Sequence, residues 1–431
     1  MNTPSGLGST MSRTRKSFPG IWSFARTVYH RARYLYFGER GFQYALHPQI
    51  QLLSPTQWVG ADRNDVGEQF FGYYDKTPWS PDTQKLLLHQ PTDDGRVQIV
   101  VYDRTKGSVQ IVASSAAWNV QQGSMAQWLP GSGGTAIIFN DVAERNLVAR
   151  LVSLDGEAIR TIPWPIQVAH PNGHEALTLN YCRLDRLRPD YGYRVDAENF
   201  RADQPLTDDG IWWLDLHSGN AELRLTLRQL ADHAPRPEMR EAQHKVNHFY
   251  YAPDGRHFVF MHRWLGAAGK HSRLYVADAN VSNPRLLLDD GMVSHYSWRD
   301  DDHVLAWAHT KDKGNRYYLI NIHSGDREVV GEGVLDVYGD GHPTFSPDRR
   351  WILTDSYPNK ARQRHLLLFN VKTQERIELG RFFAPWKFSG VIRCDLHPRW
   401  SPDGMCISVD SAHTGIRQSF VIDVRALVTS H

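Results

Sequence analysis

The chain has 431 residues, of which 41% are hydrophobic and 22% charged, a composition typical of a folded protein rather than a disordered one. Its 49 Lys and Arg residues nearly balance its 47 Asp and Glu residues. No basic stripe accompanies the net charge of +2, so we expect no nucleic-acid partner. The three cysteines form no C-x-x-C pair, as expected of a chain kept in a reducing compartment.

Residues 1–45 are predicted to form a basic N-terminal extension with a short amphipathic helix. Arginines interrupt its apolar positions, so it does not resemble a signal peptide, and we expect a cytoplasmic location and no transmembrane segment. One face of the predicted helix carries Ile21, Trp22, Ala25, Val28 and Tyr29. A helix packed on the outside of the domain is the favoured interpretation, and peripheral contact with a membrane surface is the alternative.

A short turn based on Ser-Pro-Asp recurs along residues 46–431. An apolar run follows each copy, as in an antiparallel hairpin whose turn is made by Pro, Asp and Gly. With the weaker copies included, the turns begin at Trp79, Trp128, Ala169, Tyr251, Trp298, Phe345 and Trp400. A second pair of strands follows each hairpin. The repeat therefore predicts an all-β fold, a seven-bladed β-propeller of four-stranded blades.

Two parts of the chain depart from the repeat. The last unit ends before a fourth strand, and the segment "IQLLSPTQWV" at residues 50–59 precedes the first hairpin without belonging to it. We expect this segment to be the outer strand of the last blade, which closes the ring and removes an exposed sheet edge. An insertion at about residues 185–245 holds the outer strands of the third blade, and its first part has the character of a functional loop.

Histidines share one register in four consecutive repeats. The position three residues before each turn is occupied, in chain order, by Lys76, Met125, Ile166, His248, His295, His342 and His397. The first strand of a propeller blade is the innermost, so these positions should surround the central channel. Four imidazoles there predict a metal site or a proton-transfer site. The competing interpretation is a framework residue that the repeat reuses.

The ends of the returning strands are also polar. An antiparallel hairpin brings them back beside the start of the first strand, so they should lie on the same rim. These ends carry His89, Asn140, Arg183, His262 with Arg263, His309, Asp355 with Tyr357, and Asp410 with His413. Exposure to water explains Asn140, Asp355 and His309 equally well. It explains "FMHRW" less well, because His262 and Arg263 directly follow an apolar run.

Several motifs resemble those of known propellers. The repeated turns are similar to those of TolB-type and WD-repeat propellers. The segments "FFGYYDKTPWSPD", "HRW", "GHPTFSPD" and "CDLHPRWSPDG" with "DSAHTG" resemble seven-bladed polysaccharide lyases of the oligogalacturonate-lyase and ulvan-lyase groups. The resemblance implies β-elimination in an acidic, uronate-containing oligo- or polysaccharide at one rim of the channel. It further implies a histidine-bound divalent metal such as Mn, Ca or Zn in the first group, and a His/Tyr pair with Arg in the second. No nucleotide cofactor is expected.

β-Elimination needs a group that neutralises the carboxylate, a base and an acid. We expect His248 as the base. Arg263 or Arg183 would neutralise the carboxylate, and Tyr193 or His262 would be the acid. The candidate metal ligands are His295, His342 and His397. The candidate substrate-binding residues are Lys76, His89, Asn140, Arg399, His413 and Arg417.

Two other functions stay open from the sequence. A glycoside hydrolase could use the same scaffold and would form no unsaturated sugar. A non-catalytic propeller could act as a binding module, since a fold does not determine a function. A binding module needs no converging ring of titratable groups, so the histidine register favours an enzyme.

Overall fold

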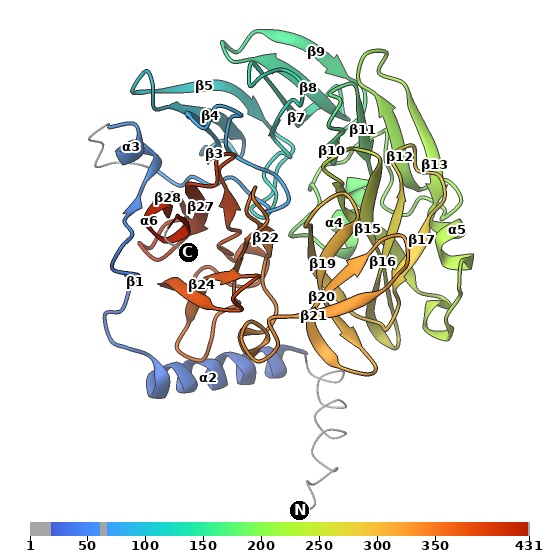
Figure 1. Cartoon of the computed structure of the whole chain (residues 1–431). Coiled ribbons are helices and arrows are strands. Elements are labelled where there is room, and N and C mark those ends of the chain that lie inside the picture. Colours follow the sequence, from blue (N-terminus) through green and yellow to red (C-terminus); the bar gives the residue numbers. More distant parts are fainter. Residues whose placement is uncertain (1–18, 61–66, 430–431) are drawn as a thin grey trace, which may run out of the picture.

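The computed structural model describes residues 19–60 and 67–429, which form a seven-bladed β-propeller (Figure 1). Seven antiparallel sheets surround a central axis, as the repeat predicts. Apolar side chains fill the space between neighbouring blades. Val259 and Leu274 of the fourth blade, for example, pack with Tyr296 and Ala306 of the fifth. Most of the core therefore lies between sheets, where a propeller buries its apolar faces.

The strands of each blade follow one another from the channel outward. Blade 1 contains β3 (Lys85–Pro91), β4 (Val97–Asp103) and β5 (Ser108–Ser115). Its innermost position holds two isolated bridges to β3, which pair Trp79 with Leu86 and Phe70 with His89. Blade 2 contains β6 (Gln127–Trp128), β7 (Ala136–Ala143), β8 (Asn146–Ser153) and β9 (Ala158–Ile162). Blade 3 contains β10 (Val168–Ala169), β11 (Glu175–Thr178), β12 (Gly210–Asp215) and β13 (Ala221–Thr226).

The remaining blades continue the same order. Blade 4 contains β14 (Gln243–Tyr251), β15 (His257–Gly266), β16 (Gly269–Asp278) and β17 (Arg285–Leu288). Blade 5 contains β18 (Val293–Trp298), β19 (His303–Thr310), β20 (Gly314–Asn321) and β21 (Arg327–Val330). Blade 6 contains β22 (Thr344–Phe345), β23 (Trp351–Asp355), β24 (Gln363–Asn370) and β25 (Arg376–Phe383). Blade 7 contains β26 (Arg399–Trp400), β27 (Cys406–Ser411) and β28 (Gln418–Asp423).

The helices are short apart from α2 (Pro19–Phe37). The others are α3 (Pro55–Trp58), α4 (Tyr181–Leu187), α5 (Leu227–Asp232) and α6 (Arg425–Val428), with single 3₁₀ turns at Pro237–Met239, Asp336–Tyr338 and Gly390–Ile392. Asn180 caps α4 by accepting a hydrogen bond from the backbone N–H of Arg183. This helix opens the long insertion of blade 3.

The recurring turn is stabilised by its own side chains. In blade 6 the hydroxyl of Ser346 donates to a carboxylate oxygen of Asp348 at 2.6 Å and accepts from the backbone N–H of Trp351 at 3.0 Å. The same bonds recur at the turns of blades 1 and 7. Ser and Asp favour turns through such local bonds, so the Ser-Pro-Asp motif belongs to the fold.

Two N-terminal strands complete the ring. Strand β2 (Leu52–Leu53) pairs with β28, opposite Ile422 and Val421, which confirms that the chain's N-terminal part closes the last blade. Strand β1 (Tyr44–Leu46) pairs with β25 and gives blade 6 a fifth strand, which the repeat does not predict. Both strands cover sheet edges that would otherwise expose unpaired backbone groups.

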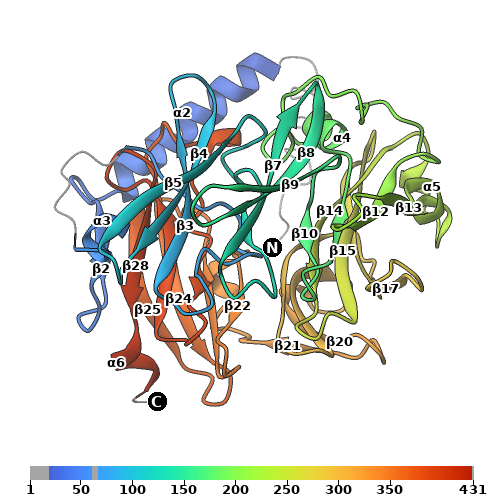
Figure 2. The ribbon, with the colours of Figure 1, turned by 90° about the horizontal axis from the view of Figure 1, so that it is seen from above.

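Helix α2 lies on the outside of the propeller (Figures 1 and 2). The ring of Tyr34 packs against Phe383 and Trp386, with centroids 5.8 and 6.0 Å away. Val28 and Tyr29 of the predicted apolar face are about half exposed. The side chains of the other three residues of that face lie outside the described part of the chain, as do residues 1–18. No helix in the described segments is long and apolar enough to cross a membrane.

Candidate functional site

The four histidines in register meet at the channel. The ring centroids of His295 and His342 are 4.2 Å apart, and those of His342 and His397 are 4.4 Å apart. His248 joins them through Tyr73, whose ring is 4.6 Å from His248 and 4.9 Å from His397. All five side chains are buried. The innermost strands of blades 4 and 5, and the segments just before those of blades 6 and 7, thus place four imidazoles in one cluster.

Irregular backbone turns these side chains into the channel. His248 and His397 have positive φ angles of 59° and 44°, which residues other than glycine rarely adopt. The pairing register also shifts next to His248, between Asn247 and Tyr250, and next to His295, between Val293 and Tyr296. Bulges of this kind aim a side chain away from the regular sheet face. Strain at several positions of one cluster is typical of functional sites.

Two of the histidines are each held by a carboxylate. One oxygen of Asp355 accepts bonds from the backbone N–H and from Nδ1 of His342, both at 2.8 Å. Because a carboxylate only accepts, Nδ1 carries the proton and Nε2 keeps a lone pair. Asp340 holds Nδ1 of His295 in the same way, at 2.8 Å. Carboxylates that fix the histidine tautomer in this manner accompany metal-binding histidines.

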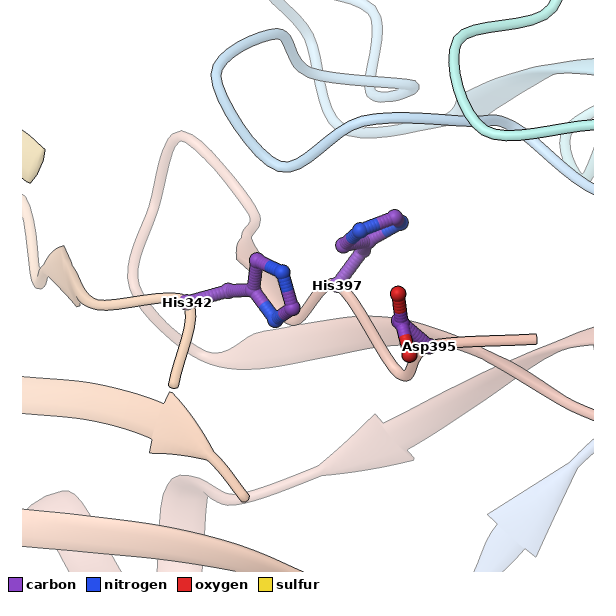
Figure 3. A group of neighbouring side chains, drawn as sticks. All are labelled: His342, Asp395 and His397. Carbon is purple, nitrogen blue, oxygen red and sulfur yellow. The ribbon is translucent and has the colours of Figure 1, made fainter. Parts of the chain in front are cut away.

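A group suited to a divalent cation is formed by His342, Asp395 and His397 (Figure 3). One ligand atom from each residue lies within 4.8 Å of the others. Nε2 of His342 and Nε2 of His397 have no hydrogen-bond partner in the described part of the chain. Two imidazole nitrogens and a carboxylate oxygen are ligands that Mn²⁺ and Zn²⁺ both accept. The donor set therefore fits a divalent cation.

Asp395 was missed by the register argument, which considered histidines alone. Burial raises the pKa of this carboxyl, but Arg364 at 2.8 Å and Arg393 at 2.6 Å overcome that effect and hold the pKa well below its ordinary value. Asp395 is therefore an anion at neutral pH. Its place two residues before His397 in "DLHP" was the available signal. His295, the third predicted ligand, lies beside His342 but outside this group.

Aromatic residues from two other segments cover the cluster. Tyr73 and Tyr74 come from the "FFGYYDK" segment before blade 1, and Tyr74 lies 5.1 Å from the ring of His342. Tyr191, from the insertion, contacts the rings of Tyr73 and His248 at 5.6 and 5.1 Å. Tyr193, the residue expected from the sequence, lies two residues away in the same "DYGY" segment. The ring of Tyr193 stacks instead on the ring of Tyr181, with centroids 4.3 Å apart.

His248 is a neutral imidazole. Burial lowers its pKa well below the ordinary value, and the positive charge of Arg263 lowers it further. Its Nδ1 has no hydrogen-bond partner among residues 19–60 and 67–429, and its Nε2 lies 3.5 Å from the hydroxyl of Tyr73. A neutral imidazole with a free nitrogen can accept a proton at neutral pH.

Arg263 stands between this cluster and a cavity. It lies on β15 directly opposite Lys245 of β14, and both line a cavity of about 190 Å³ between blades 4 and 5. Nε of Arg263 has no hydrogen-bond partner within the described segments. Burial lowers the pKa of His295, and the charge of Arg263 adds a smaller effect in the same direction. Arg263 is thus a cation near the histidines without a carboxylate partner of its own in the described structure.

The other predicted catalytic residues lie elsewhere. His262 is bonded to Nδ1 of His244 at 2.9 Å and to Nε of Arg273 at 3.2 Å. Arg183 forms a buried ion pair with Asp209 at 2.5 Å. These partners engage both side chains within blades 3 and 4. Tyr193 is likewise occupied, since its hydroxyl accepts from the side chain of Asn140 at 2.9 Å.

The predicted substrate-binding residues also have internal partners. His89 bonds to the carbonyl of Phe71 and to Ser124, Asn140 to the backbone of Ile166, and Lys76 to Asp75. Arg399 pairs with Asp410, Arg417 with Glu68, and His413 with Ser411. The bonds of His89, Asn140 and Arg417 join separate loops and blades, whereas the bonds just named for the other three are local or lie within one blade. Each of the six side chains is thus engaged within the fold, and none belongs to the histidine cluster proposed as the site.

No protein-family model matches the chain, and no curated protein is similar to it in sequence. An oligogalacturonate lyase from Vibrio parahaemolyticus has a similar structure, with a TM-score of 0.61, 14% identity, and coverage of 88% of this chain and 96% of that one. An oligogalacturonate lyase in complex with manganese gives a TM-score of 0.57, 16% identity, and coverage of 83% and 90%. TolB from Acinetobacter baumannii gives a TM-score of 0.39 and 14% identity, and the match covers 78% of this chain and 79% of that one. At these identities, the two lyase structures establish the propeller fold that they share with this chain.

Proposed function

We propose that this propeller is a lyase that cleaves uronate-containing acidic oligosaccharides by β-elimination. The observation that carries the proposal is the meeting of three chemistries around one buried cluster. A neutral base is supplied by His248, an unpaired cation by Arg263, and a cation-binding group by His342, Asp395 and His397. The structural likeness to two oligogalacturonate lyases supports the choice of reaction.

The proposed reaction breaks one carbon–hydrogen and one carbon–oxygen bond of the sugar. His248 takes the proton from the carbon next to the uronate carboxylate, the electron pair forms a ring double bond, and the glycosidic oxygen leaves. Arg263 pairs with the carboxylate, which lowers the cost of placing negative charge on that carbon. A divalent cation held by His342, Asp395 and His397 would supply further neutralisation of that carboxylate.

Tyr73 is the proposed acid for the leaving oxygen. Burial raises the pKa of its hydroxyl well above the ordinary value, so the proton is present at neutral pH. The hydroxyl lies beside Nε2 of His248, which puts acid and base on one side of a bound sugar. Tyr73 and Tyr191 fill the space in front of His248, so a substrate has to displace at least one of these rings.

Hydrolysis is less well supported because it needs two carboxyl groups that are free to react. The carboxylates of the described cluster are Asp340, Asp355 and Asp395, and each is bonded to histidine or arginine. The low pKa of Asp395 also makes it unsuited to donating a proton. These residues orient their partners instead.

The test is incubation of the manganese-loaded protein with oligogalacturonides, and separately with ulvan oligosaccharides. Ultraviolet absorbance of the unsaturated sugar is expected with at least one of them. Cleavage without that absorbance would make the protein a hydrolase. Binding without cleavage of any uronate chain would favour the non-catalytic alternative.

A further inference from the structure

We infer that the cavity between blades 4 and 5 is a second anion-binding site, which holds the carboxylate of a sugar next to the one that reacts. The inference rests on the proposed function and names its substrate class: chains with acidic groups on two adjacent sugars. The residues that would bind the second carboxylate are Lys245 and Lys270, with Arg188 at the side.

The lining of the cavity is strongly cationic. Arg188, Lys245, Arg263 and Lys270 all line it, and none of its lining residues is acidic. Arg188 is partly neutralised by Asp190, at 2.9 Å. No ion pair is found for the other three among the residues that the structure describes. So many cations around one cavity repel one another unless an anion enters.

Lys245 is the most telling of these residues. It is 8% exposed, and its Nζ has no hydrogen-bond partner in the described segments. Lysine is almost never buried without a partner, because removing the charge from water is costly. Strand pairing also sets it directly opposite Arg263, and like charges at such positions destabilise a sheet. A bound carboxylate would remove both penalties.

The cavity also lies close enough to the reacting centre to hold an adjacent sugar. Lys245 is three residues before His248 on the same strand. The guanidinium of Arg188 lies 4.8 Å from the ring of Tyr191, which in turn contacts His248. Arg263 faces both the cavity and the histidines. One carboxylate would bind at Arg263 and a second at Lys245, its partner on the neighbouring strand.

Burial lowers the pKa of Lys245 well below its ordinary value, and Arg263, Arg188 and Lys270 lower it further, against a smaller opposite effect of Asp190. An anion in the cavity would oppose all three like charges and raise this pKa. At a pH between the free and the bound pKa of Lys245, binding should therefore take up a proton. Proton uptake gives a readout that a purely structural lysine would not produce.

The test measures binding of trigalacturonate by calorimetry to manganese-loaded protein carrying His248→Ala, which prevents turnover. Adding Lys245→Met should weaken binding by about 10- to 100-fold, the effect of one charge-assisted hydrogen bond. The matched control is Lys313→Met, since Lys313 lies in the β19–β20 turn of the next blade and outside the cavity. It should leave the affinity unchanged. In paired buffers of different ionisation enthalpy, proton uptake should disappear with Lys245→Met.

Equal affinity of the Lys245→Met and Lys313→Met proteins, both folded by circular dichroism, would overturn the inference. A second ligand is trigalacturonate in which only the reacting sugar keeps a free carboxylate, the others being methyl esters. It should bind weakly, and with equal affinity to the Lys245→Met and Lys313→Met proteins. Failure of the second site can be told apart from failure of the proposed lyase function. Unsaturated product with an unchanged KM in Lys245→Met protein would remove the second site and keep the lyase. Tight, lysine-dependent binding without any product from the protein with His248 intact would keep the site and remove the lyase.

Discussion

The imidazole ring of His248 lies flat against the phenol ring of Tyr73, with centroids 4.6 Å apart and planes 9° apart. The hydroxyl of Tyr73 is 3.5 Å from Nε2 of His248, a contact between residues 175 positions apart in the chain. The segment before blade 1 thus supplies the ring that covers a histidine of blade 4. Base and acid of the proposed reaction come together only because the propeller closes.

Substitution of His248 should remove the base. We expect His248→Ala to lower kcat on an oligogalacturonide by about 100- to 10,000-fold, the usual contribution of a general base. His309→Ala, which changes a histidine at the end of β19, should leave kcat unchanged. Initial rates of unsaturated-product formation measure both. Similar rates for the two variants would show that His248 is not the base.

The hydroxyl of Tyr73 can be removed without losing its ring. Tyr73→Phe keeps the stacking on His248 and should lower kcat while KM changes little, because the proton is needed in the transition state rather than for binding. The effect should shrink with a leaving group that needs no protonation, such as a nitrophenolate. A purely structural tyrosine would show the same loss with every leaving group.

Removal of either orphaned imidazole should weaken the cation site. We expect His342→Ala and His397→Ala each to lower bound manganese, measured by elemental analysis after equilibrium dialysis, from about one ion per chain to a small fraction. His309→Ala again provides the control. Unchanged manganese in both site variants would place the ion elsewhere or leave the protein without one.

Acid should unfold the protein partly through its buried histidines. Burial lowers the pKa of His89 from 6.5 to about 4, and His89 is fully buried. The unfolded chain therefore takes up the proton first. Stability from this residue is complete above pH 6.5 and is lost as the pH falls toward 4, by up to about 3 kcal/mol. Urea unfolding of His89→Gln should show a smaller loss over this range, whereas exposed His217→Gln should match the unsubstituted protein.

Asp410 ties the Phe71–Gly72 backbone to the last blade. Its carboxylate accepts from the N–H groups of Phe71 and Gly72, both at 3.2 Å, and from Arg399 at 3.0 Å. Asp410→Ala leaves Arg399 buried without its anion and should lower the free energy of unfolding by about 3–5 kcal/mol.

The control for Asp410 is Asp203→Ala. Asp203 pairs with Arg201 on the surface, where both side chains are mostly exposed, and such pairs contribute about 0–1 kcal/mol. Denaturant unfolding compares the two variants. Equal losses would mean that the bonds of Asp410 do not hold the segment.

The sequence alone determined the propeller, its number of blades, the closing strand and the histidine register. These follow from local chemistry that repeats: a Ser-Pro-Asp turn that bonds to itself, and apolar runs on both sides of it. Once the repeat is seen, equivalent positions must surround the axis. His342 and His397 could therefore be placed near each other without coordinates.

Only the tertiary structure shows which side chains meet in the histidine cluster and which are engaged elsewhere. His262, Arg183 and Arg399 are chemically suitable, but their buried partners engage them within the fold, and Arg183 lies on α4 rather than at a strand end. Tyr73, Tyr191 and Asp395 reach the cluster from loops, whose paths no repeat fixes. The burial of Lys245 and its lack of a hydrogen-bond partner in the described segments are known only from the packed chain.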